Sequence, residues 1–377
     1  MNTKNNRKIP EFLPVSPGNE VNLLSEREES KDFYNVPTGP VTDTMLKVMG
    51  SRGELETLKQ RNKQVSHSQE VTVRKSKEKR QIIIDSGNSA VTVELSDIEK
   101  LIGNNKPAKK LFVFTSIKIA EQAMSGGDLR RDYIEFPLKE LVDTGNYKSL
   151  NSARRGFNDA MDVLTSLKVK GKLKKGKKEI EQESLRVLFT GSDIKKSTCY
   201  VYLNPRVNWG FVNAFFTIMP RYCFALPNRA FDLLYYIFYL ARQNTKAIKD
   251  KGYFTISMRA VQMRLGLPSE KGNANPDRTI KEPIEKAIEE IEDLNGNYNF
   301  TITPIYDSDK SILDFLDRGF LEIRMHEEFA KYFIELSQKQ EKKIETYQKR
   351  QQAIVDKAKE KALVKKLESE NTDKKED

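Results

Sequence analysis

The chain has 377 residues and a formal net charge of +11, from 65 Lys and Arg against 54 Asp and Glu, and this surplus attracts polyanions such as nucleic acids over long range. Two cysteines and two histidines, all far apart in the sequence, exclude a disulfide framework and a Cys/His metal cluster. The longest apolar runs are shorter than the ~20 residues that span a bilayer, and the amino terminus has no apolar signal core, so we expect a cytoplasmic bacterial protein without membrane contact or cofactor.

The first part of the chain is polar, interrupted by prolines and poor in apolar residues that could form a core. We therefore expect residues 1–78 to be a largely disordered tail, with a short helix around Thr44–Gln60. The elements expected next are two strands of a hairpin at Gln81–Asp85 and Ala90–Leu95, a short helix at Ser96–Ile102 and a break at Pro107.

Two stretches about 120 residues apart then repeat one order of elements. Apolar residues keep the same places in Tyr133–Leu141 and Tyr253–Val261, and the period changes from two to helical at the same point in both. The first stretch has a helix ending near Gln122, a strand at Tyr133–Phe136, helices at Leu138–Val142 and Asn151–Leu167, and a hairpin. The second has a helix at Asn228–Gln243, a strand at Tyr253–Ile256, helices at Met258–Leu265 and near Pro283–Leu294, and a hairpin made of Tyr298–Tyr306 and Phe320–Arg324.

This order is that of a winged helix, in which a helix-turn-helix is followed by a β-hairpin called the wing. The sequence thus predicts an α+β fold of two tandem winged-helix domains, residues 79–208 and 209–336, followed by a charged tail, 337–377, that is helical or disordered. The segment between them is rich in aromatic residues, which we expect to pack between docked domains: Trp209, Phe211, Phe215 and Phe216.

The third helix of a helix-turn-helix enters the major groove of DNA with its amino-terminal end. In the first unit this helix has an apolar stripe and a polar free face. Arg pairs with guanine and Asn with adenine, while Lys and Ser suit phosphates. Ser149 or Asn151 also suits the N-cap, which is compatible with DNA contact. The DNA-binding residues predicted here are Lys148, Ser149, Asn151, Arg154, Arg155 and Asn158.

A run of lysines follows this helix and alternates with small or apolar residues. In a strand, this alternation gives one cationic edge, which we assign to phosphate contacts as the wing of the first unit. Lysines on an edge strand can also serve only to prevent aggregation. The run resembles a phosphate-binding loop but lacks its hydroxyl residue and its strand-to-helix context, which excludes an ATPase. Its lysines are Lys168, Lys170, Lys172, Lys174, Lys175, Lys177 and Lys178.

The third helix of the second unit has an acidic free face that would repel phosphates. Basic residues occur only at the amino-terminal end of this helix and in the elements before it. DNA contact and a role in packing or dimerisation are therefore equally supported. The candidate residues are Arg259, Arg264, Lys271, Arg278, Thr279 and Lys281.

No catalytic constellation is present in the sequence. His67 and His326 are single, so neither a nucleophile triad nor a histidine-paired nuclease can be assembled. We therefore expect a binding protein and not an enzyme.

The tandem order, with a long aromatic-rich helix at Leu226–Leu240 opening the second unit, resembles the theta-type plasmid replication initiators that bind iterons. The resemblance covers about residues 80–335. It implies binding to repeated origin sites on double-stranded DNA, opening of the origin, recruitment of the host replicative helicase or its loader, and dimerisation through the first unit. The resemblance implies that the second unit carries most of the sequence reading, but in this chain the more basic helix and wing belong to the first unit.

Two other functional classes are compatible with the same folds and charges. A transcriptional regulator or partition-type protein would bind DNA without initiating replication, and an interaction scaffold would use the basic residues to contact an acidic partner. Direct repeats beside the gene would favour initiation, whereas a single palindrome over its own promoter would favour regulation.

Overall fold

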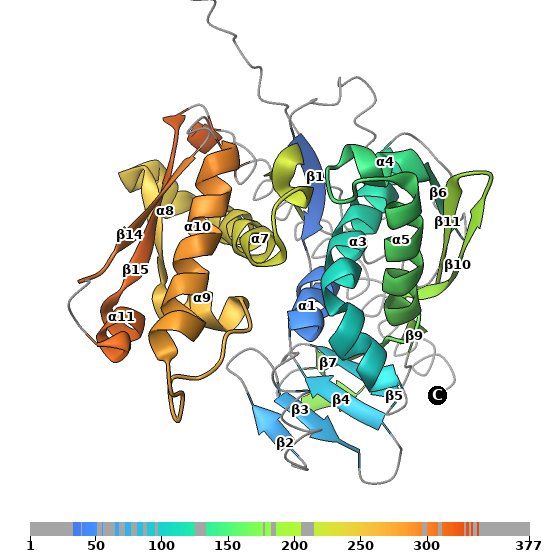
Figure 1. Ribbon diagram of the computed structural model, residues 1–377, viewed down its shortest axis with the longest axis horizontal. Coiled ribbons are helices and arrows are strands. Elements are labelled where there is room, and N and C mark those ends of the chain that lie inside the picture. The colour runs from blue at the N-terminus through green and yellow to red at the C-terminus, as the bar shows by residue number, and fades with distance from the viewer. Residues whose placement is uncertain are drawn as a thin grey trace, which may run out of the picture.

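The computed structural model describes residues 33–38, 40–50, 55, 65–67, 72–76, 81–85, 89–94, 97–124, 133–175, 178–181, 186–204, 215–295, 300–307, 311–327, 329–331, 333, 334 and 338. These residues form a mixture of helices and small antiparallel sheets, an α+β architecture (Figure 1). No helix in this part of the chain is long and apolar enough to cross a bilayer.

The repeated order of elements is present in the structure. The first unit contains α3 (Ile98–Met124), β6 (Tyr133–Pro137), α4 (Leu138–Asp143), α5 (Leu150–Leu164), β10 (Phe189–Lys195) and β11 (Thr198–Leu203). The second contains α7 (Asn228–Gln243), α8 (Thr245–Lys251), β13 (Tyr253–Ser257), α9 (Met258–Arg264), η3 (Asp277–Lys281), α10 (Glu282–Asn295), β14 (Phe300–Ile305), α11 (Ile312–Arg318) and β15 (Phe320–Met325). Of these, α8 and α11 were not expected from the sequence.

The two units share their sheet topology as well as their element order. In each, the early strand pairs antiparallel with the second strand of the hairpin, giving the orders β10-β11-β6 and β14-β15-β13. The same hydrogen bond follows both early strands: Leu138 N–H donates to the carbonyl of Ser197, and Met258 N–H to that of Gly319. The units are therefore structural repeats at the level of individual backbone contacts.

The lysine-rich strand β7 (Lys168–Lys175) forms a hairpin with β8 (Lys178–Glu181) after α5, as the sequence predicted. This hairpin is not the one that pairs with β6, because β7 pairs with β5 (Ser89–Glu94) and the hairpin next to β6 is β10–β11. β7 therefore belongs to a separate antiparallel sheet with the strand order β2-β3-β4-β5-β7-β8, in which β9 also pairs with β7. The strands of this sheet not yet given are β2 (Val65–His67), β3 (Thr72–Lys75), β4 (Gln81–Asp85) and β9 (Arg186–Val187). The alternation predicted the strand correctly, but not its partner 70 residues or more away in the sequence.

The segment 1–78, expected to be a largely disordered tail, contributes four elements to the described part of the chain, of which β2 and β3 belong to the sheet just described. β1 (Phe33–Thr38) pairs with β12 (Phe215–Pro220), and α1 (Pro40–Gly50) packs against α3. Val36, Met45 and Val48 are fully buried. Although apolar residues are few in this segment, they become part of the core through contacts with distant elements, which local composition does not reveal.

The sequence predicted a break at Pro107, but this proline lies inside the 27-residue helix α3. Proline in a helix interior costs about 3 kcal/mol. The buried stripe around it, which includes Leu101, Ala108 and Phe112, offsets this cost through packing.

The region between the units is only partly described. Trp209 and Phe211, and the side chains of Phe215 and Phe216, lie outside the described residues, as does nearly all of 337–377. The units are nevertheless in contact, because Lys109 on α3 forms an ion pair of 2.7 Å with Asp232 on α7.

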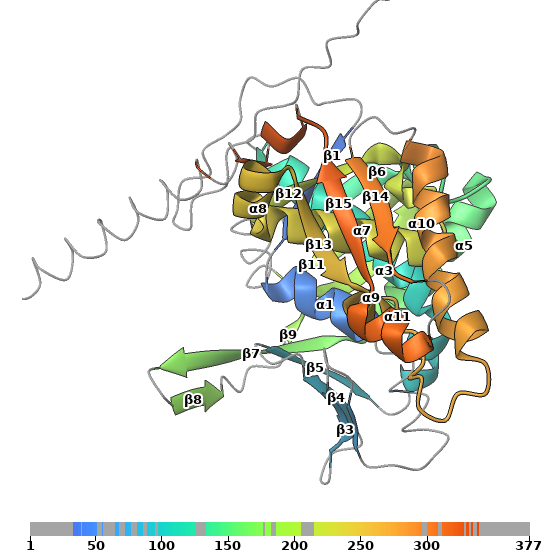
Figure 2. The same cartoon turned by 90° about the vertical axis from the view of Figure 1, so that its left-hand side faces the viewer.

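The helices α5 and α10, each expected from the sequence as the third helix of its unit, lie on the same face of the molecule. Figures 1 and 2 show them on either side of α3 and α7, running in opposite directions.

Candidate nucleic-acid interface

The start of α5 is fixed by a reciprocal capping box. The Ser149 hydroxyl accepts a hydrogen bond from Ser152 N–H at 3.2 Å, and Ser149 N–H donates to the Ser152 hydroxyl at 3.0 Å. This arrangement satisfies backbone donors that a helix start leaves open. Of the two N-caps considered from the sequence, Ser149 is the one observed.

The other side of α5 anchors it in the core. Ala153, Phe157 and Leu164 are fully buried, and the Phe136 ring on β6 contacts Phe157 and also Phe114 on α3, with ring centroids 6.2 and 5.2 Å apart. These contacts join α3, β6 and α5, so the free face of α5 has one fixed orientation.

The free face and the approach to α5 carry the residues predicted to bind DNA. All six are exposed in the structure: Lys148, Ser149, Asn151, Arg154, Arg155 and Asn158. The described part of the chain provides no ion pair for Lys148, Arg154 or Arg155. The sequence-based prediction of this surface therefore agrees with the exposure in the structure, although the Ser149 hydroxyl already serves as the cap.

The hairpin β10–β11 lies beside α5 and brings in two lysines that the sequence reading missed. Lys195 and Lys196 are exposed at its tip, where Lys196 and Ser197 adopt φ of 47° and 67°. Two successive left-handed residues form the tight turn that matches the twist of a hairpin. The alternation of Thr198–Leu203 could have predicted this strand, but the sequence-based prediction placed the wing hairpin at the lysine run that precedes it.

Charge at this tip is partly compensated within the hairpin. Lys195 Nζ lies 3.1 Å from Asp193 and 5.8 Å from the Tyr200 ring centroid, and the hydrogen bond with Asp193 raises the pKa of Lys195. The charge of Arg154 acts on Cys199 at the start of β11, although burial dominates and raises the pKa of that thiol to about 12. Arg154 on α5 is thus electrostatically close to the hairpin.

The lysine strand β7 is less purely cationic than the sequence suggested. Lys168 Nζ forms an ion pair of 3.2 Å with Glu94, while Lys172 and Lys174 are paired in backbone register with Glu181 and Glu179 of β8. Opposite charges at directly paired positions offset one another. The side chains of Lys170, Lys172, Lys174, Lys175, Lys177 and Lys178 lie outside the described side chains.

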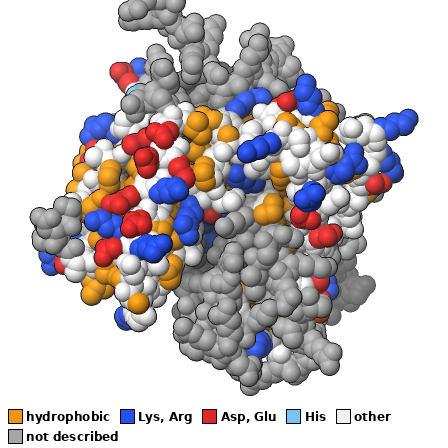
Figure 3. Space-filling view, in the orientation of Figure 1, with side chains coloured by type: hydrophobic (Ala, Val, Ile, Leu, Met, Phe, Trp, Pro, Cys, Tyr) orange, Lys and Arg blue, Asp and Glu red, His pale blue; other side chains and the backbone are white. Residues whose placement is uncertain are grey.

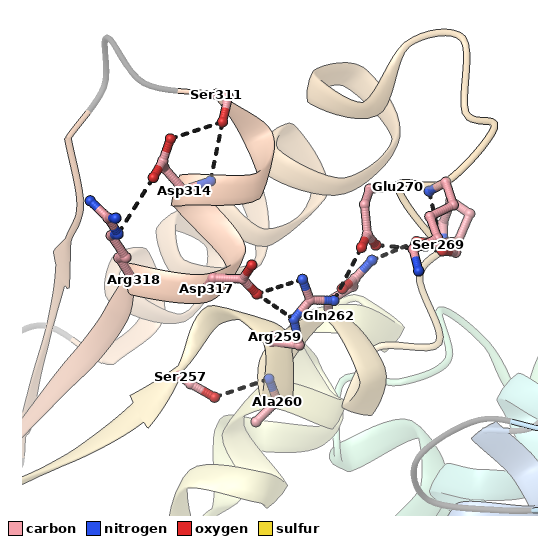
Figure 4. Close-up of polar contacts among 12 residues, drawn as sticks. Ser257, Arg259, Ala260, Gln262, Ser269, Glu270, Ser311, Asp314, Asp317 and Arg318 are labelled. Carbon is pink, nitrogen blue, oxygen red and sulfur yellow. Dashed lines mark hydrogen bonds and ion pairs between the residues drawn. The ribbon is translucent and has the colours of Figure 1, made fainter.

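In the second unit, the expected basic cluster is largely used inside the protein. Arg259 on α9 hydrogen-bonds to Asp317 on α11 at 2.8 Å and to Glu270 at 3.3 Å (Figure 4). The hydrogen bond that Arg259 donates to Asp317 raises the pKa of the guanidinium. Arg259 therefore holds α11 and the turn after α9 together instead of facing outward as an unpaired cation.

Two further cations of this cluster cover aromatic rings. Arg264 is buried, with its guanidinium 5.2 Å from the Tyr236 ring centroid, and Lys281 Nζ lies 5.0 Å from that of Tyr306. Thr279 donates its hydroxyl to the carbonyl of Asn275. Among the six candidates, only Lys271 and Arg278 are exposed. The local sequence could not show this, because the partners of the other cations lie in distant elements.

The outer side of α10 is acidic. Glu282, Glu289 and Glu292 are exposed, against one exposed lysine of the helix, Lys286, and Figure 3 shows acidic side chains with some basic ones among them on this part of the surface. Such charges repel a phosphate backbone. The second unit is therefore electrostatically unlike the first, as the sequence indicated.

The described residues contain no group of three or more His, Cys, Asp or Glu side chains that could hold a metal ion. Both cysteines are buried as free thiols.

Comparisons with known proteins give a distant structural likeness. No protein-family model and no curated protein matches the chain. Solved structures that match include domains 2 and 3 of RctB as a selenomethionine derivative, at 7% identity and a TM-score of 0.39, covering 70% of this chain and 91% of that one. A second structure of RctB domains 2–3 matches at 8% identity and a TM-score of 0.39, covering 71% and 93%.

Proposed function

We propose that the protein is a sequence-specific double-stranded-DNA-binding protein built from two winged helices. The repeated order helix, strand, helix, helix and hairpin, with the early strand paired to the last one, supports this description of each unit. In the proposal α5 and α10 are the third helices, and β10–β11 and β14–β15 are the wings.

The exposed face of α5 is the observation that carries the proposal. It combines guanidinium, ammonium and amide groups at the amino-terminal end of a capped and rigidly anchored helix. Arginine and asparagine offer bidentate hydrogen bonds to guanine and adenine in the major groove. Lys148 before the helix and the lysines of the hairpin tip suit the phosphates on either side.

The second unit has a subordinate role in this proposal. The exposed Lys271 and Arg278 can contact a phosphate near the start of α10, while the acidic side of that helix disfavours its insertion into the major groove. Because α5 and α10 share one face, a duplex bound by α5 passes near the second unit (Figure 1).

The biological role that we propose is initiation of replication at an origin with repeated sites on a plasmid or other mobile element. The tandem arrangement of two unlike units, which resembles the theta-type plasmid initiators, supports this role over that of a regulator. In the proposal the bound protein opens the origin and engages a host helicase or its loader, and it has no catalytic chemistry of its own. A homodimer formed through the first unit is part of the same proposal.

Footprinting of the full chain on the DNA that flanks its gene tests the proposal. We expect protection of a series of direct repeats, and we expect the same DNA, joined to a selectable marker, to replicate in a bacterial host only when the protein is supplied. Protection of a single palindrome without replication would favour a transcriptional regulator. Absence of any protection at low salt, where phosphate contacts are strongest, would exclude DNA binding altogether.

A further inference from the structure

The first turn of α5 contains an exposed leucine. Leu150 is the first residue of the helix, directly after the Ser149 cap, and 47% of its surface is exposed. Its neighbours Lys148 and Asn151 are both exposed polar residues that are candidates for DNA contact. An apolar group thus lies on the most polar part of the candidate interface.

The remainder of α5 shows that the core does not require an apolar residue at this position. The buried stripe begins at Ala153 and continues through Phe157 and Met161, while Leu150 precedes it and remains half exposed. The capping box is formed by the Ser149 and Ser152 side chains and backbone, so Leu150 has no part in the cap either. Leaving a leucine in water forgoes the favourable free energy of burying it.

The major groove offers one apolar feature on the bases, the C5-methyl group of thymine, and the start of a third helix is the part that approaches base edges. Resting on the proposed function, we infer that Leu150 is a specificity-determining residue that contacts a thymine methyl group. Leu150 then recognises a thymine, in addition to the guanines that Arg154 and Arg155 can recognise and the adenine that Asn151 can recognise. Burial of the methyl group against Leu150 supplies discrimination that no hydrogen bond provides.

The test uses sites selected by the full-length protein from a random duplex library. Each thymine of the selected site is replaced in turn by deoxyuridine, which removes only the methyl group and leaves base pairing intact. We expect one position at which the wild type loses about fourfold in affinity, the effect of burying one carbon group. Leu150→Ala should bind the thymine and uracil forms of that site equally.

Leu294→Ala is the matched control. Leu294 is 48% exposed near the end of α10, so this substitution removes the same side chain at similar exposure but should retain the fourfold preference for thymine. Thermal unfolding checks that both variants remain folded, which we expect because neither residue is buried. Affinity for random DNA at low salt should be the same in all three proteins.

The outcomes separate the inference from the function on which it rests. The inference is overturned if the wild type binds its site without sensitivity to any thymine methyl, if Leu150→Ala retains the preference, or if Leu294→Ala loses it as well. Failure of the wild type to select or bind any duplex at low salt would instead overturn the proposed function.

Discussion

Gly156 shows how a single residue fixes the orientation of α5. It lies in the middle of α5, and a Cβ atom built on it would lie 2.3 Å from Cε1 of Tyr147. Tyr147 belongs to the turn between α4 and α5, and burial raises its pKa to about 12. The glycine lets the Tyr147 ring pack directly on the helix backbone, so the turn and the helix are held together.

We predict that Gly156→Ala destabilises the protein, although alanine normally stabilises a helix interior by about 1 kcal/mol relative to glycine. The added methyl group must displace the Tyr147 ring, at a cost of about 1–3 kcal/mol for overpacking. Denaturant unfolding measures the change. In a Tyr147→Ala background the same substitution should become stabilising, and a stabilising effect already in the wild type would contradict the packing argument.

The arginines of α5 are the residues for which we predict a loss of base discrimination. Arg154→Ala or Arg155→Ala should reduce the preference for the selected site over a single-base variant by about 1–3 kcal/mol, because a bidentate contact to guanine is lost. Titrations of both duplexes measure this difference. Arg229→Ala, at an exposed position of α7, is the control and should leave the preference unchanged. Equal losses of specific and non-specific affinity from the α5 variants would contradict base reading.

At the scale of elements, local periodicity predicted what could be read from neighbouring residues. The helix Asn228–Gln243 was predicted with the same bounds as α7, and the stripe of Ala153 and Phe157 identified the buried side of α5. Such patterns arise because each element buries one face. The lysine strand forms the hairpin that its alternation indicated, but its pairing with β5 was not predicted, because partners far away in the sequence are not encoded in the strand's own pattern.

The two lysine-bearing hairpins should therefore contribute differently to DNA binding. We predict that Lys195→Gln with Lys196→Gln reduces the slope of log affinity against log salt by about 1–2, since each phosphate contact contributes about 0.9 and Asp193 partly offsets the charge of Lys195. The paired change Lys172→Gln with Lys174→Gln in β7 removes the same charge but should have a smaller effect, because Glu181 and Glu179 are paired with these positions. Equal reductions in slope would place β7 in phosphate contact as well.

At the scale of the whole molecule, a buried lysine links the two units. Lys110 on α3 is 6% exposed, and its ammonium donates to the carbonyls of Phe224 and Leu226 at 2.9 and 2.6 Å. It also donates to the Asn146 side chain at 3.0 Å, in the turn that precedes α5. The helix α3, the turn before α5 and the start of the second unit thus meet at one ammonium group, which the local sequence gave no reason to single out.

The titration of Lys110 gives the last prediction. Burial lowers the pKa of its ammonium to about 8, from 10.5 for an ordinary lysine, although the three oxygen acceptors favour the charged form and act against this shift. Between these two values the unfolded chain binds more protons than the folded chain, so this group makes the protein more stable as the pH rises from about 8 to 10.5. The gain is at most roughly 3 kcal/mol.

Lys110→Met isolates this contribution. The variant leaves the carbonyls of Phe224 and Leu226 without this donor, which we expect to cost about 1–3 kcal/mol for each buried acceptor. The buried thiol of Cys223 has a raised pKa and titrates in the opposite sense, but it is present in both proteins. Denaturant unfolding from pH 7 to 10 should therefore show the stability difference between wild type and variant growing as the pH rises above 8. A difference that does not change with pH would mean that Lys110 keeps its proton at the contact between the units.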